Sequence, residues 1–86
     1  MPLHTTHPDI VKRLKRSEGH LKSIIAMIEQ GRECLDIAQQ MQAVEIAIAN
    51  AKKKLVHDHI DHCLDQAVKK KSPRALEEFK EITKYL

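Results

Sequence analysis

CLDIAQQMQAVEIAIANAKKKLVHDHIDHC, residues 34–63, is the stretch that decides the fold of this 86-residue chain. It contains both cysteines and has neither glycine nor proline, so it predicts one uninterrupted helix. At ~1.5 Å per residue, roughly 38 Å of helix separates Cys34 from His59, so one chain cannot close a metal site from both ends. His59 and Cys63 are four residues apart and therefore share a helical face, where they can hold one ion together.

A second copy of this helix can supply the missing ligand. If two copies pair antiparallel about a point near Ala47 and Ile48, Cys34 of one chain arrives beside His59 and Cys63 of the other. This pairing predicts two Cys/Cys/His sites per dimer. Such a soft ligand set suits Cu(I) or Zn(II), and three ligands without a fourth favour trigonal Cu(I). On spacing alone, two unrelated polar residues explain the histidine and cysteine pair equally well.

The rest of the chain reads as helices that pack against this one. Apolar residues recur every three or four positions from about Pro8 onward, and Gly31 ends this first helix. The run KKKSP, residues 69–73, breaks the pattern, with its serine as an N-cap and its proline opening a short amphipathic third helix. We therefore expect an all-α protomer, a long helical hairpin plus a short C-terminal helix, forming one domain over residues 1–86.

Length and composition narrow the possibilities further. A small three-helix chain with one helix this long cannot bury its apolar stripe on itself, so we expect it to oligomerise. Phe79 and Tyr85 are its only aromatic residues, which leaves aliphatic side chains to build the core. No apolar run approaches the ~18 residues that span a bilayer, and the N-terminus lacks the apolar core of a signal peptide. A cytoplasmic protein with no membrane partner is therefore expected.

The formal net charge is +3, and the basic residues form two clusters. These clusters are Lys12, Arg13, Lys15 and Arg16 on the first helix, and Lys52, Lys53 and Lys54 on the second. An antiparallel dimer can merge them into one surface for phosphates, although a solvated face explains them as well. Helix-turn-helix and zinc-finger signatures are absent from the sequence, so duplex binding would use a flat helical surface. The sequence also lacks a phosphate loop, a nucleophile elbow or paired catalytic carboxylates, which argues against an enzyme.

Two motifs carry a family resemblance. Residues 13–34, RLKRSEGHLKSIIAMIEQGREC, are similar to a segment of the form RxxGHLxGIxxMLE...C. Residues 57–63, HDHIDHC, contain an H-x-x-x-C motif whose histidine lies 25 residues after the first cysteine. Both resemble the CsoR/RcnR family of bacterial metal- and thiol-responsive transcriptional repressors. The resemblance covers about residues 9–86. It implies an antiparallel four-helix-bundle dimer, a dimer of dimers, and double-stranded operator DNA bound in the ligand-free state.

The resemblance also implies roles for individual residues. The inducer site of the family's copper sensors maps to Cys34 of one protomer with His59 and Cys63 of the other. The family's outer-shell glutamate in the third helix maps to Glu78. The basic residues that touch DNA map to Lys12, Arg13, Arg16, Lys52 and Lys53.

Some positions depart from the copper-sensing pattern. Copper members often carry a tyrosine just before the first cysteine, where this chain has Glu33. Sensors of nickel, cobalt or zinc recruit histidines near the N-terminus, and this chain has His4, His7 and His20. A persulfide-sensing branch keeps both cysteines but lacks the histidine. A formaldehyde-sensing branch pairs an N-terminal proline with the first cysteine, which Pro2 and Cys34 resemble.

We therefore expect a Cu(I)-responsive repressor that leaves its operator when Cu(I) binds, with Zn(II) or Ni(II) as alternative ions. One alternative is a thiol sensor in which Cys34 and Cys63 join across protomers. Another is a helical interaction module or metal carrier that binds no DNA. His57 and His62 are either additional ligands or exposed residues on a solvated face.

Overall fold

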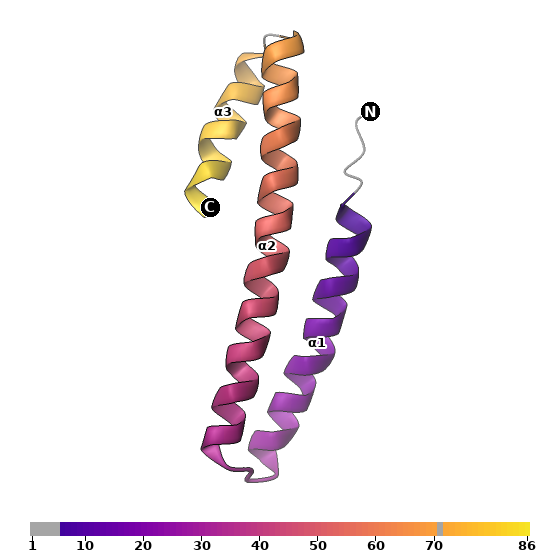
Figure 1. The fold of residues 1–86 in the computed structure, drawn as a ribbon, viewed down its shortest axis with the longest axis vertical. Helices are drawn as coiled ribbons and strands as arrows, with labels where there is room; N and C mark the ends of the chain where they lie inside the picture. Colours follow the sequence, from indigo (N-terminus) through magenta and orange to yellow (C-terminus); the bar gives the residue numbers. More distant parts are fainter. Residues whose placement is uncertain (1–5, 71) are drawn as a thin grey trace. The chain divides into compact units, whose positions relative to one another are not determined.

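A computed structural model of the chain describes residues 6–70 and 72–86. Its helices are α1 (His7–Glu29), α2 (Cys34–Lys70), α3 (Pro73–Ile82) and the short 3-10 helix η1 (Thr83–Tyr85) (Figure 1). The described residues form helices joined by short connections and include no strand, which confirms the predicted all-α protomer. Pro2 and His4 lie outside the described residues.

The ends of α1 follow from local chemistry. Asp9 lies in the first turn, where a carboxylate favours the positive end of the helix, and it forms an ion pair with Arg13 (2.8 Å). At the other end Gly31 adopts a positive φ of 72°, which glycine tolerates without steric cost. The amide of Gly31 donates to the carbonyl of Ile28 (3.1 Å), and the amide of Arg32 donates to Met27 (3.0 Å). This Schellman-type closure confirms that Gly31 ends the helix.

The boundaries of α2 and α3 also agree with the sequence. The carbonyl of Glu33 accepts a hydrogen bond from the amide of Ile37 (3.1 Å), so Cys34 is the first residue of α2. At the start of α3, the Ser72 hydroxyl accepts a hydrogen bond from the amide of Ala75 (3.2 Å), and Pro73 occupies the first helical turn. The predicted serine cap and proline start are therefore confirmed.

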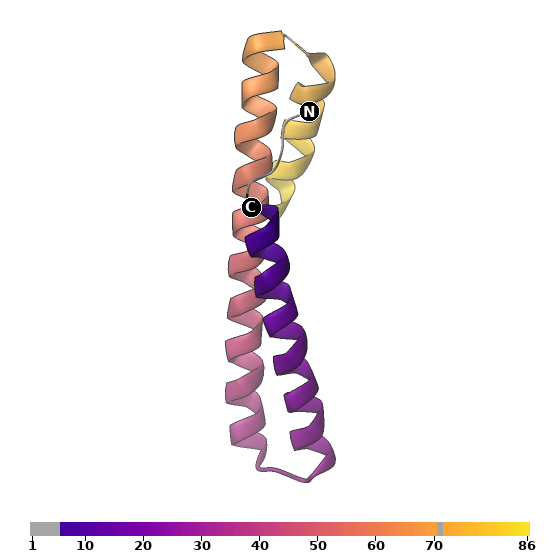
Figure 2. The ribbon, with the colours of Figure 1, turned by 90° about the vertical axis from the view of Figure 1, so that its right-hand side faces the viewer.

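The chain divides into two compact units. The hairpin unit, Pro8–Ala51, contains most of α1 and the first half of α2, which run antiparallel beside each other in both views (Figures 1 and 2). A hydrogen bond of 2.6 Å joins the side chains of His20 and Gln40 across the pair. The buried residues of this unit are Ile10, Ser17, Ile24, Val44 and Ala51. The predicted hairpin is thus confirmed.

The C-terminal unit joins the remaining described residues, 6–7 and 52–86 except residue 71. Here α3 folds back along the last turns of α2 (Figure 2). Val56 and Cys63 of α2 and Ala75 of α3 are buried, and Cys63 is only 1% exposed. This packing brings α3 over the face of α2 that carries the predicted metal ligands.

Much of the predicted apolar stripe remains exposed in the single chain. The exposed large apolar residues of this stripe are Val11, Leu14, Leu21, Ile25, Ile28, Met41, Ile48, Leu55 and Leu64. Apolar surface of this extent is what the expected partner chain would cover. The dimer, the dimer of dimers and the single domain over residues 1–86 stay predictions. In the described part of the chain, no helix is sufficiently long and apolar to span a membrane.

Candidate metal centre

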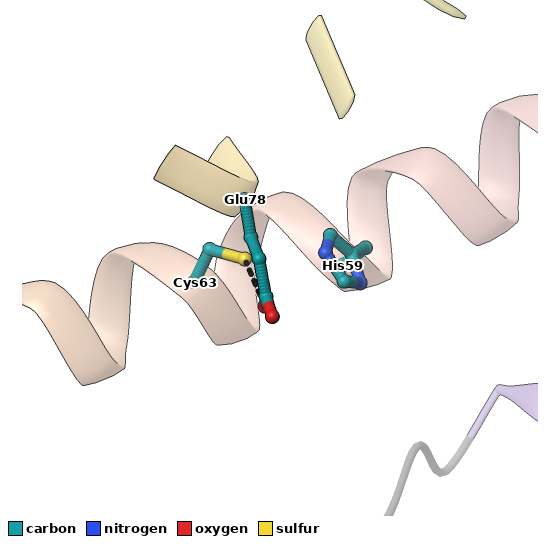
Figure 3. A group of neighbouring side chains, drawn as sticks. All are labelled: His59, Cys63 and Glu78. Atoms are coloured by element: carbon teal, nitrogen blue, oxygen red, sulfur yellow. Dashed lines mark hydrogen bonds between the residues drawn. The ribbon is translucent and has the colours of Figure 1, made fainter. Parts of the chain in front are cut away.

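The C-terminal unit brings together one histidine, one cysteine and one glutamate. His59 and Cys63 lie one turn apart on α2, and Glu78 reaches them from α3 (Figure 3). One ligating atom from each side chain lies within 4.8 Å of the others. Among the described residues, this is the group of three that could hold a metal ion. The structure therefore brings together two of the predicted metal ligands and the predicted outer-shell residue.

The thiol of Cys63 is the buried member of this cluster. His59 is half-buried and Glu78 is exposed, so the cluster opens to solvent on the glutamate side. Burial raises the pKa of the Cys63 thiol, and the negative charge of Glu78 raises it further. Cys63 is therefore a protonated thiol at neutral pH, and a metal ion must displace that proton in order to bind.

Two contacts hold the carboxylate of Glu78 over the cluster. The Cys63 thiol donates a long hydrogen bond to Oε2 (4.0 Å), and Nε of Arg74 lies 3.4 Å from Oε1. The Arg74 side chain is 90% exposed, so this ion pair costs little to break. Sequence reasoning missed Arg74, although its spacing of four residues before Glu78 on a helix was the available signal.

Cys34 is not a member of this cluster. It is the first residue of α2, it is exposed, and it belongs to the hairpin unit. The predicted role of Cys34 as a ligand from a second chain stays a prediction.

The predicted DNA-contacting residues are divided between the two units. In the hairpin unit, Arg13 and Arg16 of α1 line one hollow of about 280 Å³ together with His20 and Asn50. Lys12 is exposed in the same unit. Lys52 and Lys53 are exposed in the C-terminal unit. Sequence reasoning missed Asn50, which lines the same hollow as Arg13.

The remaining histidines have separate environments. His7 lies 3.7 Å from Asp58, and His20 is hydrogen-bonded to Gln40. His57 is exposed, as the solvated-face interpretation predicts, whereas His62 is half-buried. Within the described residues, none of these histidines belongs to the three-residue cluster.

Comparisons with known proteins define the class to which this fold and cluster belong. Residues 6–85 match the family described as metal-sensitive transcriptional repressor. The chain is 43% identical over 60 residues to the copper-sensing transcriptional repressor CsoR of Bacillus subtilis, an alignment covering 70% of this chain and 59% of that protein. It is 38% identical over 64 residues to the copper-sensing transcriptional repressor RicR of Mycobacterium tuberculosis, covering 74% of this chain and 67% of that protein.

A solved structure gives the same result for the fold. The nickel-responsive transcriptional regulator InrS is similar with a TM-score of 0.82 and 26% sequence identity, covering 100% of this chain and 99% of InrS. The chain therefore belongs to the family of metal-sensitive transcriptional repressors, which confirms the resemblance seen in the sequence. Members of this family are regulators rather than enzymes. The alignment spans about three-fifths of the length of the Bacillus subtilis protein.

Proposed function

We propose that this protein is a Cu(I)-responsive transcriptional repressor that binds operator DNA without metal and releases it when Cu(I) binds. One observation carries the proposal. His59 and the buried Cys63 lie together on one face of α2, where an imidazole and a thiolate form two-thirds of a soft ligand set. The similarity to two copper-sensing repressors supports the choice of ion.

The third soft ligand in this proposal is Cys34 of a second protomer. Cys34 is exposed at the start of α2 and thus accessible to a partner chain. The exposed apolar residues of both helices provide surface for an antiparallel partner. A cysteine, a histidine and a second cysteine favour Cu(I), which prefers sulfur ligands and accepts trigonal coordination.

The basic residues of the hairpin unit are the proposed contacts to DNA phosphates. Arg13 and Arg16 open onto one hollow beside Asn50, and guanidinium and amide groups both donate hydrogen bonds to phosphate oxygens. Lys12, Lys52 and Lys53 are exposed and add positive charge. Contacts of this kind supply affinity that falls steeply with salt.

Metal binding is coupled to DNA release because the proposed ligands belong to two chains. An ion held by both chains fixes their relative arrangement, and DNA requires a particular arrangement of the basic residues. Couplings of this type amount to about 1–3 kcal/mol, or a 5- to 150-fold change in DNA affinity.

The test is a mobility-shift titration with duplex DNA from upstream of the protein's own gene, using reduced protein under anaerobic conditions. Wild type is expected to bind DNA and to release it with one Cu(I) per protomer. Cys34→Ala and Cys63→Ala are expected to bind DNA and to keep it when Cu(I) is added. His57→Ala, which changes an exposed histidine outside the cluster, is the matched control and should release like wild type. Normal release by Cys34→Ala would sink the assignment of the third ligand.

A nickel-responsive repressor is the second candidate, and the close structural similarity to InrS favours it. His7 lies in the same unit as His59 and is a nitrogen donor of the kind that Ni(II) accepts. Repeating the mobility-shift titration with Ni(II) separates the two candidates. Release by Ni(II) but not by Cu(I) would assign the function to nickel.

A further inference from the structure

The hollow of about 280 Å³ in the hairpin unit is lined by residues of both α1 and α2. Each helix contributes positions spaced as i, i+3, i+4 and i+7, so one face of each helix forms one wall. The α2 wall consists of Ala43, Ile46, Ala47 and Asn50. Because alanine side chains are short, Ala43 and Ala47 leave space that larger residues would fill. The small residues on this face of α2 therefore account for the hollow.

The α1 wall of the hollow is rich in hydrogen-bond donors. It consists of Arg13, Arg16, Ser17 and His20. Ser17 is only 5% exposed, and its hydroxyl forms no hydrogen bond to another side chain in the described part of the chain. Nε2 of His20 lies 2.6 Å from Oε1 of Gln40, and this contact holds the imidazole in place. Together with the Asn50 amide of the opposite wall, donors from two helices line one small volume.

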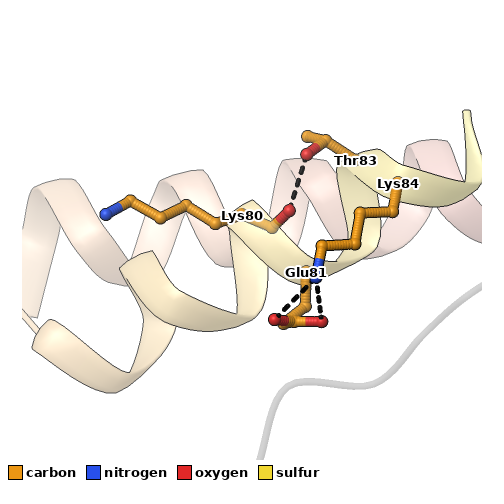
Figure 4. Close-up of polar contacts among 4 residues, drawn as sticks. All are labelled: Lys80, Glu81, Thr83 and Lys84. Carbon is orange, nitrogen blue, oxygen red and sulfur yellow. Dashed lines mark hydrogen bonds and ion pairs between the residues drawn. The ribbon is translucent and has the colours of Figure 1, made fainter.

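The positive charge of this hollow is only partly balanced by carboxylates. Arg13 forms an ion pair with Asp9 through Nε (2.8 Å), which uses one of the five N–H donors of its guanidinium. Arg16 forms no ion pair with a carboxylate in the described part of the chain. The basic residues of α3 and η1, by contrast, have acidic partners, and Lys84 donates two hydrogen bonds to Glu81 (3.1 Å each) (Figure 4). An anion from solution would supply the balancing charge in the hollow.

We propose that this hollow binds a phosphate dianion, either inorganic phosphate or a small phosphate monoester. Such a dianion offers at least three terminal oxygens, which match two guanidiniums and several neutral donors. The volume lies at the lower limit of the ~300–1,000 Å³ typical of ligand pockets, so the hollow suits a ligand of few atoms rather than a nucleotide. Ile46 and the two alanines offer apolar surface to a short carbon chain, which favours the monoester.

A phosphate of the DNA backbone matches the hollow less well. It is a diester with a single negative charge, and two of its four oxygens are bonded to carbon. The small dianion would instead compete with DNA, because Arg13 and Arg16 are the proposed contacts to DNA phosphates. Occupation of the hollow would thus weaken operator binding without metal. This consequence rests on the proposed function, whereas the binding of the dianion does not.

The experiment measures phosphate binding to the full-length protein by isothermal titration calorimetry, without metal or DNA and at constant ionic strength. The probes are glycerol 3-phosphate, inorganic phosphate and dimethyl phosphate, at a mildly alkaline pH where the first two are dianions. Both dianions should bind at least about tenfold more tightly than dimethyl phosphate, as expected for one lost hydrogen bond to a charged group. Tighter binding of glycerol 3-phosphate than of inorganic phosphate would identify the ligand as a monoester, and equal binding would identify it as free phosphate.

Two variants locate the binding in the hollow. Ala43→Leu fills the hollow from the α2 wall without removing a charge and should weaken binding of both dianions at least about tenfold. Ala49→Leu makes the same exchange at an exposed position of α2 that does not line the hollow, and this matched control should bind like wild type. Arg16→Gln changes an exposed side chain and should weaken binding by a similar factor without disturbing the fold, which circular dichroism checks.

Several results would overturn the proposal: no binding of either dianion to wild type, equally tight binding of dimethyl phosphate, or unchanged affinity in Ala43→Leu or Arg16→Gln. The calorimetric titration contains neither metal nor DNA. Failure of copper-responsive repression appears instead in the mobility-shift titration, so the two failures are distinguishable.

Discussion

The first and second halves of α2 carry one cysteine each, and these two cysteines differ in almost every physical respect. Cys34 is the first residue of the helix and is exposed, with no α3 in its unit to cover it. Cys63 is 1% exposed, lies one turn from His59, and faces Glu78 of α3. One end thus presents a single accessible sulfur, and the other presents an organised cluster.

This difference teaches how a small chain can make metal binding depend on assembly. Under the proposed function, the cluster supplies two soft donors and Cys34 of a second protomer supplies the third. Neither cysteine alone completes a Cu(I) site, so Cu(I) binding would require two paired chains. Three predictions test this comparison, from the largest expected effect to the smallest.

The largest expected effect is in thiol alkylation. Iodoacetamide should modify Cys34 of the metal-free protein roughly a hundredfold faster than Cys63, because Cys63 must first be uncovered by local opening that costs ~3 kcal/mol. Its raised pKa adds to the protection, since the thiolate is the reactive form. Mass spectrometry of the alkylated peptides gives both rates, and urea-unfolded protein, where the two rates should converge, is the control.

Addition of Cu(I) sharpens this test. If Cys34 is the third ligand, one Cu(I) per protomer should protect Cys34 as well as Cys63. Persistent rapid alkylation of Cys34 in the copper-loaded protein would contradict the shared site. Equal rates at the two cysteines in the folded, metal-free protein would contradict the comparison itself.

The second prediction concerns pH. The pKa of Cys63 is raised above its usual value of 9.0, mainly by burial and to a smaller extent by the negative charge of Glu78. Glu78→Gln should therefore lower this pKa without bringing it back to its usual value. Below its pKa the thiol must release one proton to bind metal, so its contribution to affinity should rise about tenfold per pH unit. Ultraviolet absorbance of the thiolate, measured in a Cys34→Ala/Tyr85→Phe background where no tyrosinate overlaps it, follows the titration of Cys63 alone.

The same shift has a consequence for stability. Well below pH 9.0 the Cys63 thiol is protonated in both folded and unfolded chains, so the shift in its pKa does not change the stability of the fold. Above pH 9.0 the unfolded chain ionises first, so the fold should lose stability as pH rises. Glu78→Gln should reduce this loss. An identical alkaline titration in the variant and its parent would show that Glu78 does not act on the thiol.

The helices were predictable from sequence because their signals are local. Gly31 at a positive φ, the Ser72 cap and the uninterrupted run after Cys34 each act within one or two turns, and each boundary was found where predicted. The relation of His59 to Cys63 was equally accessible, since four residues of helix fix it.

The role of α3 was much less accessible. Resemblance to the family pointed to Glu78 as an outer-shell residue, but no sequence signal gave its distance from Cys63, which depends on how α3 packs on α2. The apolar periodicity of α2 likewise did not predict that this packing buries Cys63. Nor did the apolar periodicity reveal which positions a single chain buries: Ile24 is 4% exposed, whereas Ile25 and Ile28 are each 55% exposed.

The third prediction tests whether α3 must be held in place for the two ends of α2 to differ. Ser72→Ala removes the hydroxyl that accepts from the Ala75 amide (3.2 Å), and loss of such a cap costs about 1 kcal/mol. The melting temperature should fall by about 4–8 °C for a chain of this size. Ser72→Asp keeps an N-cap acceptor and is the matched control.

Because α3 carries Glu78 and covers Cys63, the alkylation rate of Cys63 should rise about fivefold in Ser72→Ala, as expected if local opening costs about 1 kcal/mol less. A Cys63 rate that stays constant while the melting temperature falls would mean that α3 does not control access to the cluster.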